Sequence, residues 1–190
     1  ASLKRSISSF MEQSLPKTLP KMLQRTATEY PEIPAQFSKL KDGSFEQISY
    51  RELYQFSLDA AAGLLHLGVQ RGQPVGLISD NRKEWQQIDM GIMAIGAVDV
   101  PRGCDATLID LEAILSITEC SIVIAENSSQ VKKIISLKEK LPALAQIICF
   151  DPATEEVLKE AESLNVKVYT FEELIKLGQT YRIDHKNAVE

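Results

Sequence analysis

Short apolar segments alternate with helix-like apolar patterns along most of this 190-residue chain, and this alternation is the strongest constraint on its fold. The predicted strands recur about every 20 to 25 residues, at 75–79, 97–100, 121–125, 146–150 and 166–170. Between them, apolar residues recur at spacings of three and four, as they do on one face of a helix. The pattern predicts βαβ units, and therefore an α/β fold with a doubly wound, mostly parallel sheet.

Residues that commonly begin and end helices mark the boundaries of these units. Ser49, with Glu52 three residues later, has the form of a capping box, and Gly68 suits the end of the helix that would follow. Asn81 and Glu84 repeat the pattern after the first strand of the sheet, so we expect Asn81 to cap a helix there. We expect further helices over residues 107–115, 131–141 and 155–164.

The region before the capping box predicts a small N-terminal addition to the sheet. Apolar residues at helical spacing indicate a short helix within residues 18–29, which the prolines that follow would end. The turn dipeptide Asp42-Gly43 between two short extended segments then indicates a β-hairpin. We expect residues 1–17 to form a flexible tail.

Composition excludes several classes of protein. The net charge of −5 gives no general attraction for nucleic acid, whose binding requires concentrated Lys and Arg, so we expect no nucleic-acid partner. The longest apolar run, residues 90–98, is far shorter than the roughly 20 residues of a bilayer crossing. Cys104, Cys120 and Cys149 are too widely spaced to suggest a disulfide framework or a metal site. We therefore expect a reducing, cytoplasmic location.

Basic residues gather near the N-terminus. The first 25 residues contain one acidic residue, Glu12, and five basic ones: Lys4, Arg5, Lys17, Lys21 and Arg25. No apolar segment of the secretory type follows the early charges, so we do not expect a secretory signal. A solvated tail is the simplest interpretation, while a transit peptide and peripheral attraction to an anionic membrane surface are the alternatives.

The common catalytic and phosphate-binding motifs are missing from the sequence. Neither Gly-x-x-x-x-Gly-Lys nor Gly-x-Gly-x-x-Gly occurs, and no Gly-x-Ser-x-Gly elbow is present. The two histidines, His66 and His185, lack the spacing of metal ligands. The acidic pairs at 155–156 and 172–173 fit helix starts better than an acid and base pair. We therefore predict no metal site and no catalytic residue.

The order of several short motifs is more informative than any one of them. They run as follows: Ile48-Ser49-Tyr50, Ala62-Gly63-Leu64, Arg71-Gly72-Gln73-Pro74-Val75, Ser79-Asp80-Asn81-Arg82-Lys83-Glu84-Trp85, and Ile95-Gly96-Ala97-Val98 with Val100-Pro101. The ordered series resembles the N-terminal portion of the AMP-forming acyl-CoA synthetases. Residues 79–85 are similar to the Asn-Arg-x-Glu-Trp of the long-chain members.

The resemblance implies a reaction in two steps. A fatty carboxylate attacks the α-phosphate of MgATP to give acyl-AMP and pyrophosphate, and the thiol of CoA then displaces AMP. The family's phosphate loop, adenine pocket, metal-binding acid and mobile-domain Lys do not occur in residues 1–190. We therefore expect this chain to be an N-terminal fragment of the AMP-binding domain of a long-chain fatty acid–CoA ligase. By itself it should be inactive and bind neither ATP nor Mg²⁺.

Two alternatives stay open. The stretch at 102–107 is longer and more polar than the usual family segment and is similar to a branch that includes the acyl-acyl carrier protein synthetases of plastids. Acyl carrier protein is therefore an alternative acceptor to CoA. A non-catalytic α/β binding module is an alternative from another class, and a Thr-Ser-Gly-x-x-Gly-x-Pro-Lys-like loop after residue 190 would favour the ligase.

Asn81 and Arg102 are the candidate substrate-binding residues. Both should lie just past the carboxyl ends of parallel strands, where open α/β sheets form ligand crevices. For Asn81 we favour the helix cap, and for Arg102 a structural ion pair, over contact with a substrate or carrier anion. Trp85 is expected in the core rather than in a lipid pocket.

We also expect an exposed apolar surface. A truncated α/β unit lacks the segments that would cover its sheet, and large apolar patches bind partners. Association with a second copy of the chain, as a homodimer, is one outcome of such a surface.

Overall fold

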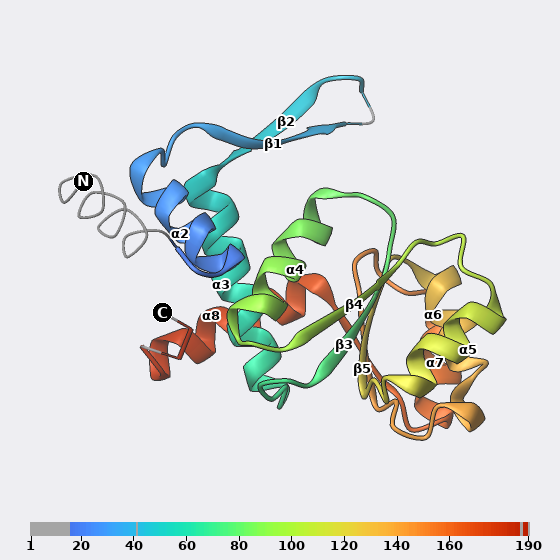
Figure 1. Cartoon of the computed structure of the whole chain (residues 1–190). Coiled ribbons are helices and arrows are strands. Elements are labelled where there is room, and N and C mark those ends of the chain that lie inside the picture. The colour runs from blue at the N-terminus through green and yellow to red at the C-terminus, as the bar shows by residue number, and fades with distance from the viewer. Residues whose placement is uncertain (1–15, 41, 187, 190) are drawn as a thin grey trace, which may run out of the picture.

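The computed structural model describes residues 16–40, 42–186 and 188–189, so most of the tail expected at residues 1–17 lies outside the described residues. Five parallel strands form the central sheet in the spatial order β4-β3-β5-β6-β7 (Figure 1). They are β3 (Pro74–Ile78), β4 (Val98–Arg102), β5 (Ile122–Ala125), β6 (Gln146–Cys149) and β7 (Lys167–Thr170). The predicted parallel α/β sheet is confirmed.

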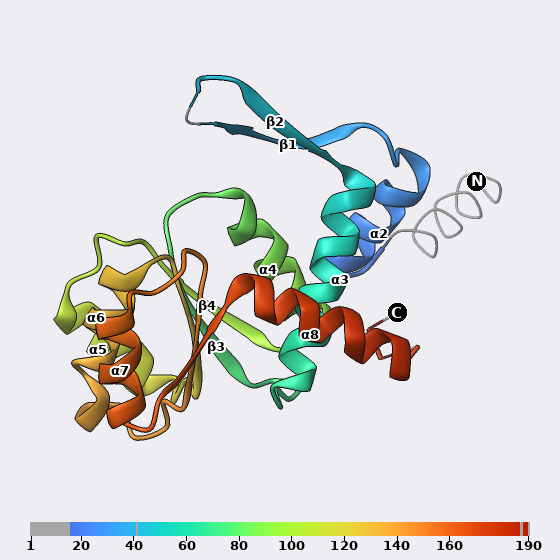
Figure 2. The ribbon, with the colours of Figure 1, turned by 180° about the vertical axis from the view of Figure 1, so that it is seen from behind.

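Helices cover both faces of the sheet (Figures 1 and 2). These are α3 (Tyr50–His66), α4 (Lys83–Ala94) and α8 (Phe171–Asp184) on one face, and α5 (Leu108–Ile117), α6 (Ser128–Ile135) and α7 (Glu155–Ser163) on the other. Helix α2 (Leu19–Glu29) packs against α3 and α4 instead of the sheet. Because side chains alternate along a strand, Val75 and Leu77 of β3 pack with α3, α4 and α8, while Ile78 packs with α5, α6 and α7. The sheet is therefore doubly wound, as predicted.

Most of the predicted helix boundaries agree with the structure. Reciprocal capping boxes begin α3 at Ser49 and α5 at Thr107. The helix expected at 131–141 is shorter than predicted, because α6 ends at Ile135 and a 3-10 turn, Lys138–Lys140, follows. Leu137 and Leu141 still reach the same core. An apolar spacing of three and four residues suits both helix types, so the sequence did not distinguish them.

The cap predicted at Asn81 is wrong. Helix α4 begins two residues later, with Arg82 in the cap position and no side-chain hydrogen bond to the first turn. The physical reason is that Glu84, which a capping box would direct to the backbone of Asn81, instead pairs with Arg82, with 2.7 Å between Nε and Oε2. The charged pair replaces the predicted backbone contact.

Helix α3 is buried on two sides, whereas its sequence pattern predicted one. Helix α8 crosses it where Gly63 and Gly178 allow the two backbones to touch, and a Cβ atom on Gly178 would overlap the backbone of Asp59. The Asp59 carboxylate pairs with Arg182 of α8 and accepts a hydrogen bond from Gln179 at 3.1 Å. Helix α8 therefore fastens the C-terminal end of the described chain to its N-terminal third.

A β-hairpin projects from this α/β body (Figure 1). It consists of β1 (Pro34–Lys39) and β2 (Phe45–Ser49), which pair antiparallel around the turn predicted at Asp42-Gly43. Two side-chain contacts fix its orientation against α4: Gln36 Nε2 donates to Gln86 Oε1 at 2.8 Å, and Lys83 Nζ lies 2.6 Å from Glu46 Oε2. The expected hairpin is confirmed and held in place.

Apolar side chains are exposed on α5. Ile109 is 79% and Ile117 is 81% exposed, and Val98 on the neighbouring edge strand is half exposed. Separately, none of the helices in the described part of the chain combines the length and apolarity that a bilayer crossing requires.

Two carboxylates meet between α4 and the edge strand β4. Asp89 is only 8% exposed, and it shares a hydrogen bond with Asp99. Burial, followed by the like charge and hydrogen bond of Asp99, raises the pKa of Asp89 to about 6. The pair therefore holds a proton at a pH where an ordinary Asp has lost it.

This pair predicts a pH-dependent stability. The folded state binds the Asp89 proton more tightly than the unfolded chain does, so its contribution to the free energy of unfolding falls as pH rises from about 4 to 6 and is constant above that. We expect Asp89→Asn to gain stability relative to wild type over this range. Urea unfolding at each pH measures it, with exposed Asp184→Asn as control. An Asp89→Asn advantage that does not grow with pH would contradict the assignment.

Candidate functional site

The candidate site lies at the carboxyl edge of the sheet, where the winding direction reverses. The chain passes from β3 to β4 on one side and then crosses to β5 on the other, which makes β3 the switch point. Ligand crevices form outside the carboxyl ends of strands at such points. Residues 79–81, 103–107 and 126–127 leave the sheet there.

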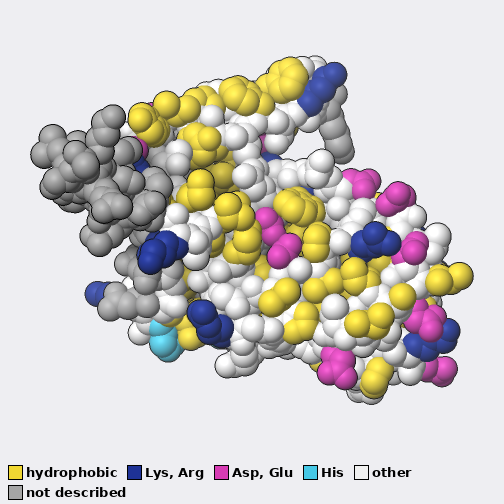
Figure 3. Space-filling view, in the orientation of Figure 1, with side chains coloured by type: hydrophobic (Ala, Val, Ile, Leu, Met, Phe, Trp, Pro, Cys, Tyr) yellow, Lys and Arg dark blue, Asp and Glu magenta, His cyan; other side chains and the backbone are white. Residues whose placement is uncertain are grey.

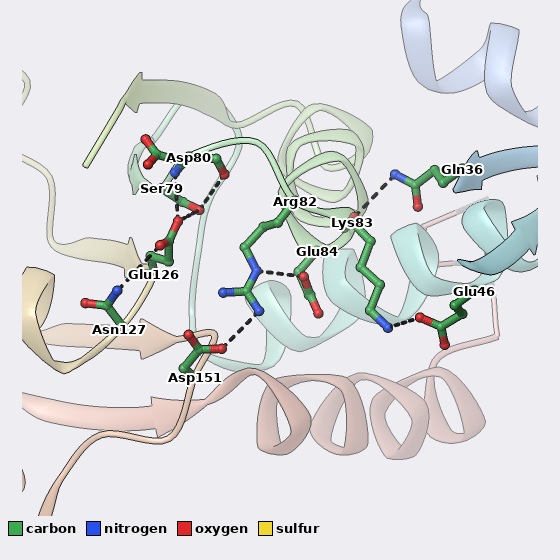
Figure 4. Close-up of polar contacts among 10 residues, drawn as sticks. All are labelled: Gln36, Glu46, Ser79, Asp80, Arg82, Lys83, Glu84, Glu126, Asn127 and Asp151. Atoms are coloured by element: carbon green, nitrogen blue, oxygen red, sulfur yellow. Dashed lines mark hydrogen bonds and ion pairs between the residues drawn. The ribbon is translucent and has the colours of Figure 1, made fainter. Parts of the chain in front are cut away.

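Glu126 joins the loops at this edge. Its Oε2 atom accepts hydrogen bonds from the Ser79 hydroxyl at 3.0 Å and from the Asp80 backbone N–H at 2.8 Å (Figure 4). The Asp80 carboxylate accepts in turn from the backbone N–H of Cys104 at 3.0 Å. One carboxylate after β5 therefore positions the loop after β3, which positions the loop after β4.

Arg82 makes a second link across the edge. It lies between Glu84 and Asp151, with its Nη2 3.0 Å from Asp151 Oδ1 (Figure 4). Its guanidinium also lies over the Phe150 ring, 5.2 Å from the ring centre. These contacts hold the pKa of Arg82 above its usual value, although burial alone would lower it. The start of α4 is therefore tied to the loop after β6.

These loops border a pocket of about 520 Å³. It is lined by Ser79, Asp80, Asn81, Trp85, Pro101, Arg102 and Gly103. A neighbouring groove of about 640 Å³ shares Asn81 and continues between α4 and the hairpin. The two hollows together run along the carboxyl edge toward the projecting hairpin.

Asn81 and Arg102, the two residues predicted from the sequence, lie in the same pocket. Asn81 is exposed and free of the cap role expected for it. Arg102 forms the predicted ion pair, with its Nη2 3.7 Å from Asp110 Oδ1, and both side chains are nearly half exposed. Such a loose surface pair adds little stability, so Arg102 can turn toward a bound anion at small cost. Substrate contact by either residue stays a prediction.

Trp85 is half-buried. It packs against the core of α3, α4 and the sheet, as predicted, and it also contributes to the wall of the pocket. Trp85 therefore contacts the core with one side of its ring and lines the pocket with the other.

One group of possible metal ligands occurs among the described residues. Single ligand atoms of Asp80, Cys104 and Glu126 lie within 4.8 Å of one another. The carboxylates already accept hydrogen bonds that join the loops, which explains the cluster without an ion. Burial first, and the neighbouring carboxylates second, raise the pKa of the Cys104 thiol to about 11. This thiol is therefore no nucleophile at neutral pH.

The sequence analysis did not identify Glu126, Asp80 or Ser79 as connected residues. All three lie within two residues of the end of a strand, so the rule that drew attention to Asn81 and Arg102 also applied to them. The missing information was the strand order, because Glu126 meets Ser79 only if β5 lies next to β3.

A five-stranded parallel sheet with helices on both faces and an N-terminal hairpin matches the N-terminal subdomain of an adenylation domain. The adenylation domain of a carboxylate reductase from Mycobacterium chelonae superposes with a TM-score of 0.73 at 20% identity, over 87% of this chain and 30% of that one. The anthranilate CoA ligase AuaEII, solved with anthranoyl-AMP, gives a TM-score of 0.72 at 22% identity, over 86% of this chain and 29% of that one. These likenesses show the fold.

The sequence assigns the family. The chain belongs to the AMP-binding enzymes, an adenylate-forming family whose model matches residues 23–185. It is 29% identical to the long-chain-fatty-acid–CoA ligase ACSBG2 of Xenopus laevis over 164 residues, which are 86% of this chain and 21% of that protein. It is 28% identical to the chloroplastic long-chain-fatty-acid–[acyl-carrier-protein] ligase AEE15 of Arabidopsis thaliana over 166 residues, 87% of this chain and 22% of that protein. The chain spans about a fifth of the length of these relatives.

The described residues do not fit a nucleotide on their own. The carboxyl edge carries the carboxylates of Asp80, Glu126 and Asp151, which would repel phosphate groups. Arg102 is the one cation that lines the pocket of about 520 Å³. Phosphate oxygens need several placed N–H donors or cations, so triphosphate binding requires groups outside this edge.

The raised pKa of Cys104 predicts slow reaction with thiol reagents. At pH 7 its thiolate fraction should be roughly a hundredfold below that of an ordinary cysteine, and the labelling rate should keep rising beyond pH 9. Cys104→Ser provides the background of the buried Cys120 and Cys149. Glu126→Gln should speed labelling, because it removes a nearby negative charge. A rate that levels off below pH 9 would contradict this environment.

Proposed function

We propose that this chain is the first part of a ligase for long-chain fatty acids. The complete enzyme would use MgATP to convert the acid to acyl-AMP and pyrophosphate, and would then transfer the acyl group to CoA. The observation that carries the proposal is family membership together with relatives that are named as long-chain fatty acid ligases. The ordered motifs from Ile48 to Pro101 support it.

In this proposal, residues 1–190 supply a scaffold and one wall of the substrate site. The doubly buried sheet fixes the carboxyl edge, and Glu126 holds the loops that border the pocket. Asn81 and Arg102 would face a substrate or carrier anion from that wall. Groups that stabilise charge on the transferred phosphate would come from other parts of the enzyme.

The thiol acceptor is CoA in our first proposal and acyl carrier protein in the second. The relatives in Xenopus and Arabidopsis are named for different acceptors, yet their identities to this chain differ by one percentage point. The polar stretch at 102–107 supports the carrier protein, because it is similar to the branch that includes the acyl-acyl carrier protein synthetases. A non-catalytic binding module is the remaining alternative.

We further propose a cytoplasmic enzyme that associates peripherally with membranes. Long-chain fatty acids partition into bilayers, so an enzyme that uses them gains from residence at the bilayer surface. The basic residues near the N-terminus, Lys17, Lys21 and Arg25 among them, support this location.

The first functional prediction concerns catalysis. Residues 1–190 alone should release no pyrophosphate from labelled ATP and palmitate, because no cradle of donors meets the transferred phosphate. The full-length protein should release pyrophosphate with Mg²⁺ and palmitate, and AMP once CoA or acyl carrier protein is added. Supplying each acceptor separately decides between the two ligases. A full-length protein inactive with every fatty acid would contradict the ligase proposal and favour the binding module.

The second functional prediction concerns Arg102. In the full-length enzyme, Arg102→Ala should raise KM for an anionic substrate or the acceptor about tenfold, the effect of losing one charge-assisted hydrogen bond. The free energy of unfolding should change by less than about 0.5 kcal/mol, because the pair with Asp110 is exposed. Arg51→Ala is the matched control, since its ion pair with Glu32 is also exposed. Unchanged KM values would show that Arg102 contacts neither substrate nor acceptor and has only its ion pair with Asp110.

A further inference from the structure

The outer face of the hairpin exposes two phenylalanines. Phe37 of β1 is 64% exposed and Phe45 of β2 is 65% exposed. Phe45 pairs with Lys39, which is two residues from Phe37, so all three side chains share one face of the ribbon. Two aromatic side chains so largely in water, with a lysine between them, require an explanation.

The structure fixes which way this face points. The opposite face carries Gln36 and Glu46, and these bind Gln86 and Lys83 of α4. A two-stranded hairpin cannot turn one face without turning the other, so the contacts to α4 keep Phe37 and Phe45 directed away from the body of the protein.

The apolar surface continues along the hairpin. Tyr30 and Ile33 at its base and Leu40 near its tip are each close to half exposed. In the space-filling view, apolar side chains follow the hairpin, with a basic side chain at its far end (Figure 3). These apolar side chains form a narrow row on a projecting hairpin. Such a shape suits insertion into a lipid surface better than it suits a protein pocket.

Charge is distributed unevenly between this region and the remainder of the chain. Residues 1–51 contain eight Lys and Arg against five Asp and Glu, a net charge of +3. Residues 52–190 contain 13 against 21, a net charge of −8. The part that carries the hairpin is therefore attracted to an anionic surface, while the larger part is repelled from it.

We propose that the β1–β2 hairpin inserts Phe37 and Phe45 into an anionic lipid bilayer. Phenylalanine rings would enter the boundary between headgroups and acyl chains, and Lys39 would extend its ammonium to the anionic headgroups. A second copy is a poorer occupant, because a two-fold contact would bring Lys39 and the net positive region against themselves. The proposal deepens the peripheral association in the proposed function, but bilayer binding itself requires no turnover.

The geometry also relates the hairpin to the candidate site. The groove of about 640 Å³ is lined by hairpin residues, including Gln36 and Glu46 on the face toward α4, and by Asn81, which also lines the pocket. A hairpin seated in a bilayer would therefore hold one end of this groove at the lipid surface. An acid leaving the bilayer would meet the groove before bulk water.

Vesicle sedimentation with the 190-residue chain tests the proposal. It should bind phosphatidylcholine vesicles that contain phosphatidylserine more tightly than vesicles of phosphatidylcholine alone. The double variant Phe37→Ser, Phe45→Ser should bind these vesicles at least about tenfold more weakly, because its apolar contacts with the bilayer are lost. The matched control is Ile109→Ser, Ile117→Ser on α5, which removes two apolar side chains that are even more exposed and should bind like wild type.

Two further measurements separate the causes. Lys39→Glu should weaken binding to vesicles with phosphatidylserine and leave binding to pure phosphatidylcholine nearly unchanged, and added salt should reduce that difference. Brominated lipids should quench the added fluorescence of the Phe45→Trp variant, with the signal of Trp85 in the unaltered chain as the reference. Circular dichroism confirms that each variant is folded.

Several results would overturn the proposal. An equal loss of vesicle affinity in the hairpin and α5 variants would indicate non-specific adsorption of exposed apolar side chains. Unchanged affinity in the hairpin variant would show that the phenylalanines do not contact the bilayer. The wild-type chain could instead bind no vesicles and form a dimer in light scattering that Phe37→Ser, Phe45→Ser disrupts. That result would assign the outer face of the hairpin to contact with a second copy. None of these results depends on ligase activity, so they are distinguishable from failure of the proposed function.

Discussion

The rest of the structure depends on the burial of β3 and β5 from both sides. On one face of the sheet the fully buried side chains are Val75, Leu77, Ile122 and Ile124. On the other face they are Ile78 and Val123. Strands covered on both faces pair in parallel through helical crossovers, and parallel strands end at a common edge. The place of the candidate site therefore follows from apolar packing, before any polar residue is considered.

Polar contacts then give that edge its shape. Glu126 reaches across from β5 to the loop after β3, and Asp80 extends the link to the loop after β4. Arg82 adds a connection to the loop after β6. Asn81 and Arg102 lie in the same pocket but outside this network, and Arg102 is held only by its surface pair with Asp110.

The sequence predicted the fold well because its signals were local and agreed with one another. Capping boxes, strand composition and the turn at Asp42-Gly43 each concern residues close together in the chain, and each is present in the structure. The prediction at Asn81 failed where a local rule met a competing contact, since Arg82 took the Glu84 carboxylate. The sequence placed Asn81 and Arg102 at the carboxyl edge, where the structure also has them, but it did not reveal the network around Glu126, and substrate contact by either residue stays a prediction.

The sequence by itself determined the class of fold, the family and the lack of a phosphate loop in residues 1–190, because these depend on local pattern and motif order. Tertiary structure decided the strand order, and with it the meeting of Glu126 with Ser79, 47 residues apart. It also decided that α8 packs against α3 through Gly63 and Gly178, and that the hairpin turns its phenylalanines outward. These outcomes arise from contacts between distant segments, which alternation and spacing along one chain do not encode.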